Sequence, residues 1–333
     1  MVYENELAQL TFALVKAAND RDITLLITVH DGWTKARFEG HPLNASNGGV
    51  LLQNNQYVEL ENYSSELPSI ISPGWSRQKI NQWIQERFVD RLVAATGNYP
   101  NVIYEVMNEG EWYPRTSAIK FEKHFLEFIK ARSHQPVMIN DDHIGGSLVT
   151  DPLTDGISLH KPDWDSNTGV SEPFNHYMNY FFAEDLVEIK PITFNEPVPG
   201  YSGGSSERRG LTRLMWGTLL AGASFYLPDD VSWKWNSSSQ ADPMLDRLGY
   251  AATFFSLLGD EISDLTPLAG ISTSSACLGA PGKHYIMYAN GAASVTIDLS
   301  GDTSLYSVRL FDPLVGVFQA TELTIQGGGV STV

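Results

Sequence analysis

The chain begins with a segment whose apolar residues recur every three or four positions, followed by a short β-branched run. The first pattern, over residues 4–19, predicts a helix, and the second, over residues 23–29, predicts a buried strand. The same alternation continues along the chain. Further helices are predicted at 77–96, 117–132, 173–187, 207–220 and 243–258, and further strands at 102–108, 137–140, 156–160, 192–195 and 224–227. Strands separated by helices indicate parallel βαβ units.

This order predicts an α/β protein whose main domain is a TIM-type (β/α) barrel with about six β/α units. A complete barrel has eight strands and eight helices, so we expect a barrel that is incomplete at the N-terminus, with the first two strands and the helix between them missing or replaced. A naturally reduced barrel is one alternative. Closure by a second chain, which would make a homo-oligomer, is another, because it covers open strand edges.

Beyond about residue 260 the helical pattern ends, and short alternating strands are separated by turns rich in Gly and Ser. The predicted strands are 285–289, 294–299, 306–311 and 316–325. This pattern of short strands and turns predicts a small antiparallel β-sandwich. We therefore expect a (β/α) barrel catalytic domain over residues 1–260 and a C-terminal β-sandwich accessory domain over residues 261–333.

The formal charge of −17 and the pI near 4.8 argue against nucleic acid and anionic membranes as partners, because phosphate binding needs clustered Lys and Arg. A neutral polysaccharide remains compatible with this charge. The single cysteine, Cys277, excludes an internal disulfide. No apolar run approaches the ~20 residues that cross a bilayer. No signal peptide is visible, so a secreted or periplasmic location is expected only if further sequence precedes Met1, and localisation is left open.

Polar residues follow the predicted strands at the point where each strand ends, and in a (β/α) barrel these ends and their loops build the active site. The exits are His30-Asp31-Gly32-Trp33, Asn108-Glu109, Asn140-Asp141-Asp142-His143, His160-Lys161, Asn195-Glu196, and Tyr226 with Asp229 and Asp230. A single Glu at a strand end is usually a capping or solvated carboxylate. Two Asn-Glu endings in register with other polar exits indicate catalysis instead, because glycosidic bond cleavage uses two carboxylates that face each other across a sugar.

The runs Val102-Ile-Tyr-Glu-Val-Met-Asn-Glu109 and Pro191-Ile-Thr-Phe-Asn-Glu196 resemble the clan-A retaining glycoside hydrolases, especially enzymes similar to glycoside hydrolase family 5. The resemblance covers roughly residues 1–260, and the C-terminal region looks like the small β-domain of bacterial relatives. It implies that Glu109 is the acid/base, that Glu196 is the nucleophile and that Asn108 holds the sugar 2-hydroxyl. It also places His160 near the nucleophile.

The remaining candidate residues are predicted to bind the substrate. Aromatic rings in strand-exit loops suit stacking on pyranose rings, and polar side chains there suit sugar hydroxyls. These candidates are His30, Asp31, Trp33, Trp112, Asn195, Tyr226, Trp233 and Trp235. Glu105 has the same strand parity as Glu109, and we interpret it as a structural, hydrogen-bonded carboxylate of the core.

The sequence thus predicts a retaining hydrolase of β-linked glycosides or polysaccharides of glucan, mannan, xylan or galactan type, with a carbohydrate substrate, no cofactor and no metal. A non-catalytic carbohydrate-binding protein with a decayed site is one alternative. A metal-dependent barrel hydrolase is another, with ligands drawn from His30, Asp31, Asp141, Asp142, His143 and His160. Its weakness is that neither His-x-His nor His-Glu-x-x-His occurs.

Overall fold

The computed structural model describes residues 2–61, 71–140, 148–160, 171, 173–175, 190–195, 204–225, 243–274, 276–292 and 294–333. The chain divides into two compact units, Met1–His160 and Lys161–Val333. Within the described ranges, no helix is both long enough and apolar enough to cross a lipid bilayer.

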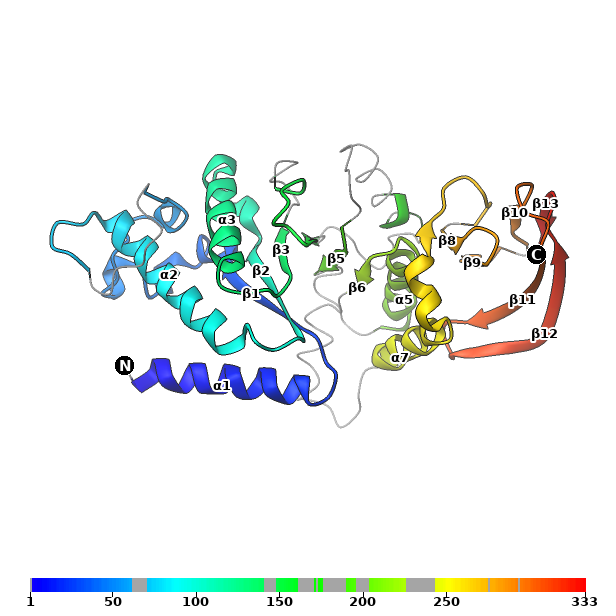
Figure 1. Ribbon diagram of the computed structural model, residues 1–333, viewed down its shortest axis with the longest axis horizontal. Coiled ribbons are helices and arrows are strands. Elements are labelled where there is room, and N and C mark those ends of the chain that lie inside the picture. The colour runs from blue at the N-terminus through cyan, green and yellow to red at the C-terminus, as the bar shows by residue number, and fades with distance from the viewer. Residues whose placement is uncertain are drawn as a thin grey trace. The chain divides into compact units, whose positions relative to one another are not determined.

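The first unit contains parallel strands that pair in chain order and alternate with helices (Figure 1). Its strands are β1 Leu25–Asp31, β2 Val102–Asn108, β3 Val137–Asn140 and β4 Gly156–His160, and its helices are α1 Val2–Asn19, α2 Arg77–Thr96 and α3 Arg115–Lys130. The 3-10 turns η1 Gly32–Thr34, η2 Phe38–Gly40, η3 Ala45–Asn47 and η4 Asn54–Tyr57 follow β1, and η5 Gly110–Trp112 follows β2. This is the βαβ order that the hydrophobic pattern predicts.

Strand β2 lies in the core of this unit, and five of its seven residues are buried. Burial on both faces explains why its sequence is mostly apolar rather than alternating between apolar and polar residues. Its Tyr104 is fully buried, and the hydroxyl lies 2.6 Å from Thr96 Oγ1 at the end of α2. The start of α2 is fixed by Ser76, whose Oγ accepts a hydrogen bond from the backbone N–H of Lys79 at 3.0 Å.

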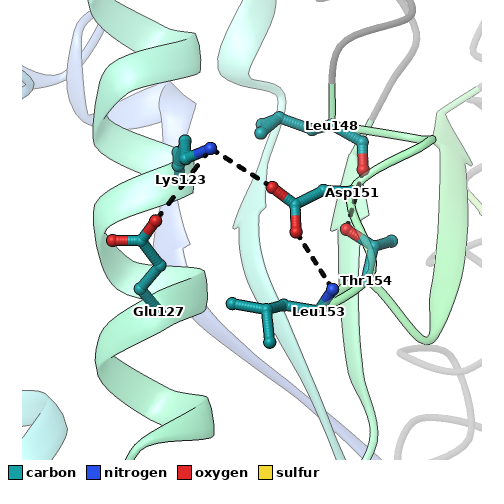
Figure 2. A network of polar contacts seen from close by, with 6 residues as sticks. All are labelled: Lys123, Glu127, Leu148, Asp151, Leu153 and Thr154. Carbon is teal, nitrogen blue, oxygen red and sulfur yellow. Dashed lines mark hydrogen bonds and ion pairs between the residues drawn. The ribbon is translucent and has the colours of Figure 1, made fainter.

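A polar network joins α3 to the segment that leads into β4 (Figure 2). Lys123 Nζ lies 3.4 Å from Asp151 Oδ2 and 4.0 Å from Glu127 Oε1. Asp151 Oδ1 accepts from the Leu153 N–H at 3.0 Å, and Thr154 Oγ1 donates to the Leu148 carbonyl at 2.8 Å. Because the Lys123 side chain is half exposed, its ion pairs contribute little, and the local hydrogen bonds hold this turn.

The second unit continues with the parallel pair β5 Ile192–Asn195 and β6 Ser224–Phe225. The helices of this unit are α5 Ser205–Leu220 and α7 Pro243–Ser256, followed by the 3-10 turn η7 Gly259–Asp264. The two α-helices are tied together by Arg247, whose Nη1 donates to the Arg208 carbonyl and to Thr212 Oγ1, both at 2.7 Å.

After η7 the chain forms three small antiparallel sheets. They are β7 Thr266–Pro267 with β8 Cys277–Ala280 and β9 His284–Met287, then β10 Thr296–Asp298 with β13 Val330–Thr332, then β11 Leu305–Asp312 with β12 Val317–Gln326. The long hairpin β11–β12 is drawn in red tones in Figure 1. Its Phe311 and Phe318 pack with Trp216 of α5 and Phe254 of α7, at ring-centroid distances of 5.0 to 5.9 Å.

The predicted fold class is confirmed: parallel strands alternate with helices as in an incomplete TIM-type barrel, and small antiparallel sheets follow. Strands β2 to β5 have the predicted bounds. Most of the helix predicted at 173–187 lies outside the described residues, although 173–175 are helical. The sequence pattern missed β7, β8 and β13. The domain division at residue 260 stays a prediction.

Candidate active site

The ends of β1 and β2 lie side by side, with Asp31 paired to Asn108 in the parallel ladder. Directly after them, the backbones of Gly32 and Glu109 come into close contact. A Cβ on Gly32 would lie 1.8 Å from the Glu109 carbonyl oxygen, so only glycine allows this approach. The chain therefore brings the exits of two strands together at one place.

Glu109 is 4% exposed and has φ 52° and ψ 42°, the left-handed conformation. A residue other than Gly in this region is uncommon and costs conformational energy, and such residues cluster at functional sites. The turn of the backbone at Glu109 ends β2 and starts η5. One carboxylate predicted for catalysis is thus buried at a strand exit.

His30, the second-to-last residue of β1, is buried beside aromatic rings of α3. Its ring centroid lies 4.8 Å from Phe121 and 4.4 Å from Phe125. Desolvation, followed by the nearby His124, lowers the pKa of His30 to about 3, so the imidazole is neutral. Its Nδ1 lies 3.1 Å from the hydroxyl of Tyr57, which belongs to η4.

Tyr57 links His30 to its surroundings. Burial, followed by the charge of Asp31, raises the pKa of Tyr57, and a hydrogen bond with Thr34 lowers it. The net effect keeps the phenol protonated, and it shares a hydrogen bond with His30 Nδ1. The other ring nitrogen of His30, Nε2, is buried and has no hydrogen-bond partner among the described residues.

Tyr113 forms a second buried phenol at this site. Its ring stacks on Tyr57 at 6.1 Å and an interplanar angle of 18°, and its hydroxyl has no hydrogen-bond partner in the described part of the chain. Burial raises the pKa of Tyr113 above its usual value. Neither Tyr57 nor Tyr113 is among the site residues predicted from the sequence. Tyr113 was signalled by its place beside Trp112, whereas Tyr57 lies in a long loop without any local signal.

Two of the predicted aromatic residues meet at the surface of the site. Trp33 and Trp112 are 38% and 42% exposed, and their ring centroids are 5.8 Å apart. The guanidinium of Arg37 lies 4.9 Å from the Trp33 ring. Lys35 donates to the carbonyl of Trp112 and so joins η1 to η5. The pair presents partly open indole rings beside Glu109.

Asp31 and Asn108 have different surroundings although they pair in the ladder. Asp31 is exposed, and its Oδ1 accepts from the Trp33 N–H at 3.0 Å, which caps η1. The Asn108 Oδ1 is buried and has no hydrogen-bond partner among the described residues. Farther down the same strands, Thr28 Oγ1 donates to Glu105 at 2.5 Å, in agreement with the structural interpretation of Glu105.

Other predicted positions are described only in part. The backbones of His160 and Asn195 lie at the ends of β4 and β5, but their side chains are outside the description. Several candidates lie outside the described residues altogether, namely Glu196, Tyr226, Trp233 and Trp235, as do the alternative metal ligands Asp141, Asp142 and His143. Within the described ranges, no three His, Cys, Asp or Glu side chains gather closely enough to hold a metal ion.

No protein-family profile matches the chain, and no curated protein sequence matches it. Its fold does match solved structures. A crystal structure of a glycoside hydrolase family 5 protein from Bacteroides vulgatus superimposes with a TM-score of 0.60 at 10% identity, over 98% of this chain and 82% of that chain. A second structure, described as a glycoside hydrolase, superimposes with a TM-score of 0.57 at 10% identity, over 98% of this chain and 85% of that chain.

These likenesses define the class of the protein at the level of fold. The chain is an α/β protein of the (β/α)-barrel type with a small β-domain. Its structural neighbours are glycoside hydrolases, including a family 5 protein.

Proposed function

We propose that the protein is a retaining glycoside hydrolase that cleaves β-linked glycosides or polysaccharides, of glucan, mannan, xylan or galactan type. The observation that carries the proposal is the buried Glu109 at the exit of β2, in a left-handed conformation and beside the exposed pair Trp33 and Trp112. The likeness of the fold to glycoside hydrolase structures supports the same class.

The proposed mechanism is a double displacement by two glutamates. Glu109 donates a proton to the glycosidic oxygen while Glu196 attacks the anomeric carbon, so the leaving alcohol departs and a glycosyl ester forms on Glu196. Glu109 then removes a proton from water, which attacks the same carbon and releases Glu196. Two inversions give overall retention. The role needs Glu109 protonated before the first step, and burial favours the neutral form of a carboxyl group.

Residues around the two carboxylates are proposed to hold the sugar. Asn108 donates to the 2-hydroxyl, and the indoles of Trp33 and Trp112 contact the apolar faces of pyranose rings. Trp233, Trp235, Tyr226, Asn195 and His160 are proposed to complete the cleft. Because the imidazole of His30 packs against α3 and the Asp31 carboxylate caps η1, we expect His30 and Asp31 to act mainly through the shape of the subsite.

The test is hydrolysis of aryl β-glycosides and β-linked polysaccharides, with the anomer of the first product followed by NMR. We expect a retained configuration in the wild type and a loss of about 10²–10⁴-fold or more in Glu196→Gln and Glu109→Gln. For Glu109→Gln, glycosides with an acidic phenol as leaving group should retain more of their glycosylation rate, since that departure needs less protonation.

The matched control is Glu111→Gln, two residues beyond Glu109 in the same exit loop. It should keep the wild-type rate. Equal losses in all three variants would contradict the assignment of Glu109, and an inverted product would contradict the double displacement. A folded wild type that binds sugars without turnover would instead support a carbohydrate-binding protein.

A further inference from the structure

The C-terminal part of the second unit contains a cavity of about 330 Å³. It lies between the sheet β7–β8–β9 and the turn that follows β10. Its lining combines the apolar side chains Leu268, Ile271 and Leu299 with one aromatic residue, Tyr285, and two carboxylates, Asp298 and Asp302. Small-molecule sites have this composition, a mostly apolar wall with a few placed polar groups, and begin at about this size.

Tyr285 is held in place at the wall of the cavity. Its hydroxyl oxygen accepts from the Gly282 N–H at 3.2 Å, and its ring packs edge-on against Tyr306 at 5.6 Å. A Cβ on Gly279 would lie 3.1 Å from the Tyr285 ring, which shows how closely β8 supports it. Because the oxygen is used as an acceptor, the hydroxyl proton is left to donate to a ligand.

Asp302 presents a carboxylate oxygen without a partner. Its Oδ1 accepts from the N–H of Ser304 at 2.8 Å and from its Oγ at 2.7 Å. Its Oδ2 is buried and has no hydrogen-bond partner among the described residues. An added Cβ on Gly282, which also lines the cavity, would lie 3.9 Å from it. A buried acceptor with no donor costs free energy, and a donor on a ligand would remove that cost.

The turn that carries Asp302 is fixed by the connection between β12 and β13. Gln326 Nε2 donates to the carbonyls of Thr303 and Ser304 at 2.6 and 3.2 Å. Gly327 approaches so closely that a Cβ there would lie 2.3 Å from the Asp302 carbonyl oxygen. The carboxylate is therefore positioned before any ligand arrives, which lowers the entropic cost of binding.

At the rim, Asp298 adds a second acceptor. Hydrogen bonds from the side chain and backbone of Ser300 lower the pKa of Asp298, so it is ionised at neutral pH. Among the described residues, no Lys, Arg or His lines the cavity. Two carboxylates with no cation beside them repel anionic ligands, and they readily accept hydrogen bonds from hydroxyl groups.

We propose that this cavity binds a neutral sugar residue, as a binding site separate from the candidate active site. The apolar side chains and the Tyr285 ring suit the CH face of a pyranose, and Asp302, Asp298 and the Tyr285 hydroxyl suit its hydroxyl groups. A metal ion fits less well, since most of the wall is apolar. This site goes beyond the proposed hydrolysis and does not depend on it.

The test uses the full-length protein with ¹³C-labelled Leu and Ile methyl groups, in a Glu109→Gln, Glu196→Gln background so that no sugar is consumed. Neutral β-linked tetrasaccharides of glucose, mannose, xylose and galactose are titrated while the methyl signals of Leu268, Ile271 and Leu299 are followed. We expect saturable shifts with at least one sugar. Asp302→Asn keeps the Oδ1 acceptor but replaces Oδ2 by a donor, and it should weaken that binding by about tenfold.

The control Asp260→Asn removes one exposed charge from the same region outside the cavity and should leave the binding unchanged. Absence of methyl shifts up to about 10 mM sugar would overturn the proposal, because binding that weak has no specific site. The proposal would also be overturned if Asp302→Asn bound the sugar with the same affinity as the protein with Asp302 intact. It would likewise be overturned if calcium chloride or ethanolamine, in place of sugar, shifted the same methyl signals to saturation. In a protein that carries only Asp302→Asn, with Glu109 and Glu196 intact, turnover of a small aryl glycoside should be unchanged. Loss of sugar binding at the cavity can therefore be distinguished from failure of the proposed hydrolysis.

Discussion

Gly32 is the residue that lets two strand ends meet at the candidate active site. Its Cα lies against the backbone of Glu109, where an added Cβ would be 1.8 Å from the carbonyl oxygen and 2.5 Å from the carbonyl carbon. The obstacle is backbone rather than a flexible side chain. We therefore expect Gly32→Ala to lower the free energy of unfolding by about 1–3 kcal/mol, as overpacking does, and to displace Glu109. Urea denaturation measures the first effect.

Gly40→Ala is the matched control, because a Cβ at Gly40 meets nothing within 4 Å. Its free energy of unfolding should stay within about 0.5 kcal/mol of the wild type. Equal stability of the two variants would contradict the close approach of Gly32 and Glu109.

His30 should make stability depend on pH. Its pKa is about 3 in the folded protein, mainly because of burial, and about 6.5 in the unfolded chain. As the pH falls below 6.5 the unfolded chain takes up the proton first, so the stabilisation present above pH 6.5 is lost towards pH 3. Relative to His30→Asn, which keeps a hydrogen-bonding group beside Tyr57, the wild type should lose up to about 1.4 kcal/mol per pH unit in this window.

The measurement is urea denaturation at a series of pH values. His134→Asn, a change at an exposed histidine, should follow the wild-type profile. A difference between wild type and His30→Asn that does not change between pH 6.5 and pH 4 would show that His30 is hydrated in the folded protein.

At the scale of elements, the first turn of α2 depends on a side chain outside the helix. Ser76 Oγ accepts from the Lys79 N–H at 3.0 Å and donates to Glu61. We expect Ser76→Ala to cost about 0.5–2 kcal/mol, as the loss of an N-cap does. Ser76→Thr keeps the hydroxyl and should recover most of it. Thermal or urea unfolding of the three proteins measures this, and equal losses in both variants would contradict a capping role.

Strand and helix positions were largely predictable because the hydrophobic period is local. The run from Val102 to Asn108 is mostly apolar and contains several β-branched residues, and β2 has these bounds. Strands β7 and β13 were missed because they have only two and three residues, too few to show a hydrophobic period, and β13 is fixed by pairing with the distant strand β10. Strand β8, Cys277–Ala280, is buried throughout and shows no alternation to detect.

At the scale of the whole molecule, the charge of −17 should oppose folding through self-repulsion. Raising NaCl from about 0.02 M to about 0.5 M shortens the Debye length from about 20 Å to about 4 Å, so we expect the Tm at pH 7.5 to rise. Near pH 4.8, where the sequence is neutral overall, the same salt change should have little effect. Differential scanning calorimetry at the two pH values checks this, and a Tm at pH 7.5 that falls with salt would contradict it.

The candidate site was predictable where strand exits carry its residues. Asn108 ends β2, and Trp33, Glu109 and Trp112 lie just after the parallel strands β1 and β2. Neighbouring parallel strands end at the same edge of a sheet. Tyr57 was not predictable in this way. It reaches His30 and Tyr113 from a loop, and neither contact leaves a periodic trace in the sequence.

By itself the sequence determined the alternation of helices and strands, the acidic character and the two Asn-Glu strand ends, because each depends on residue type and local spacing. The tertiary structure decided which side chains meet. The approach of Gly32 to Glu109, the neutral His30 beneath Tyr57 and the cavity around Asp302 all join residues that the chain keeps apart. Burial and hydrogen bonding at such contacts set the chemistry of a group, and both come from packing rather than from the order of residues.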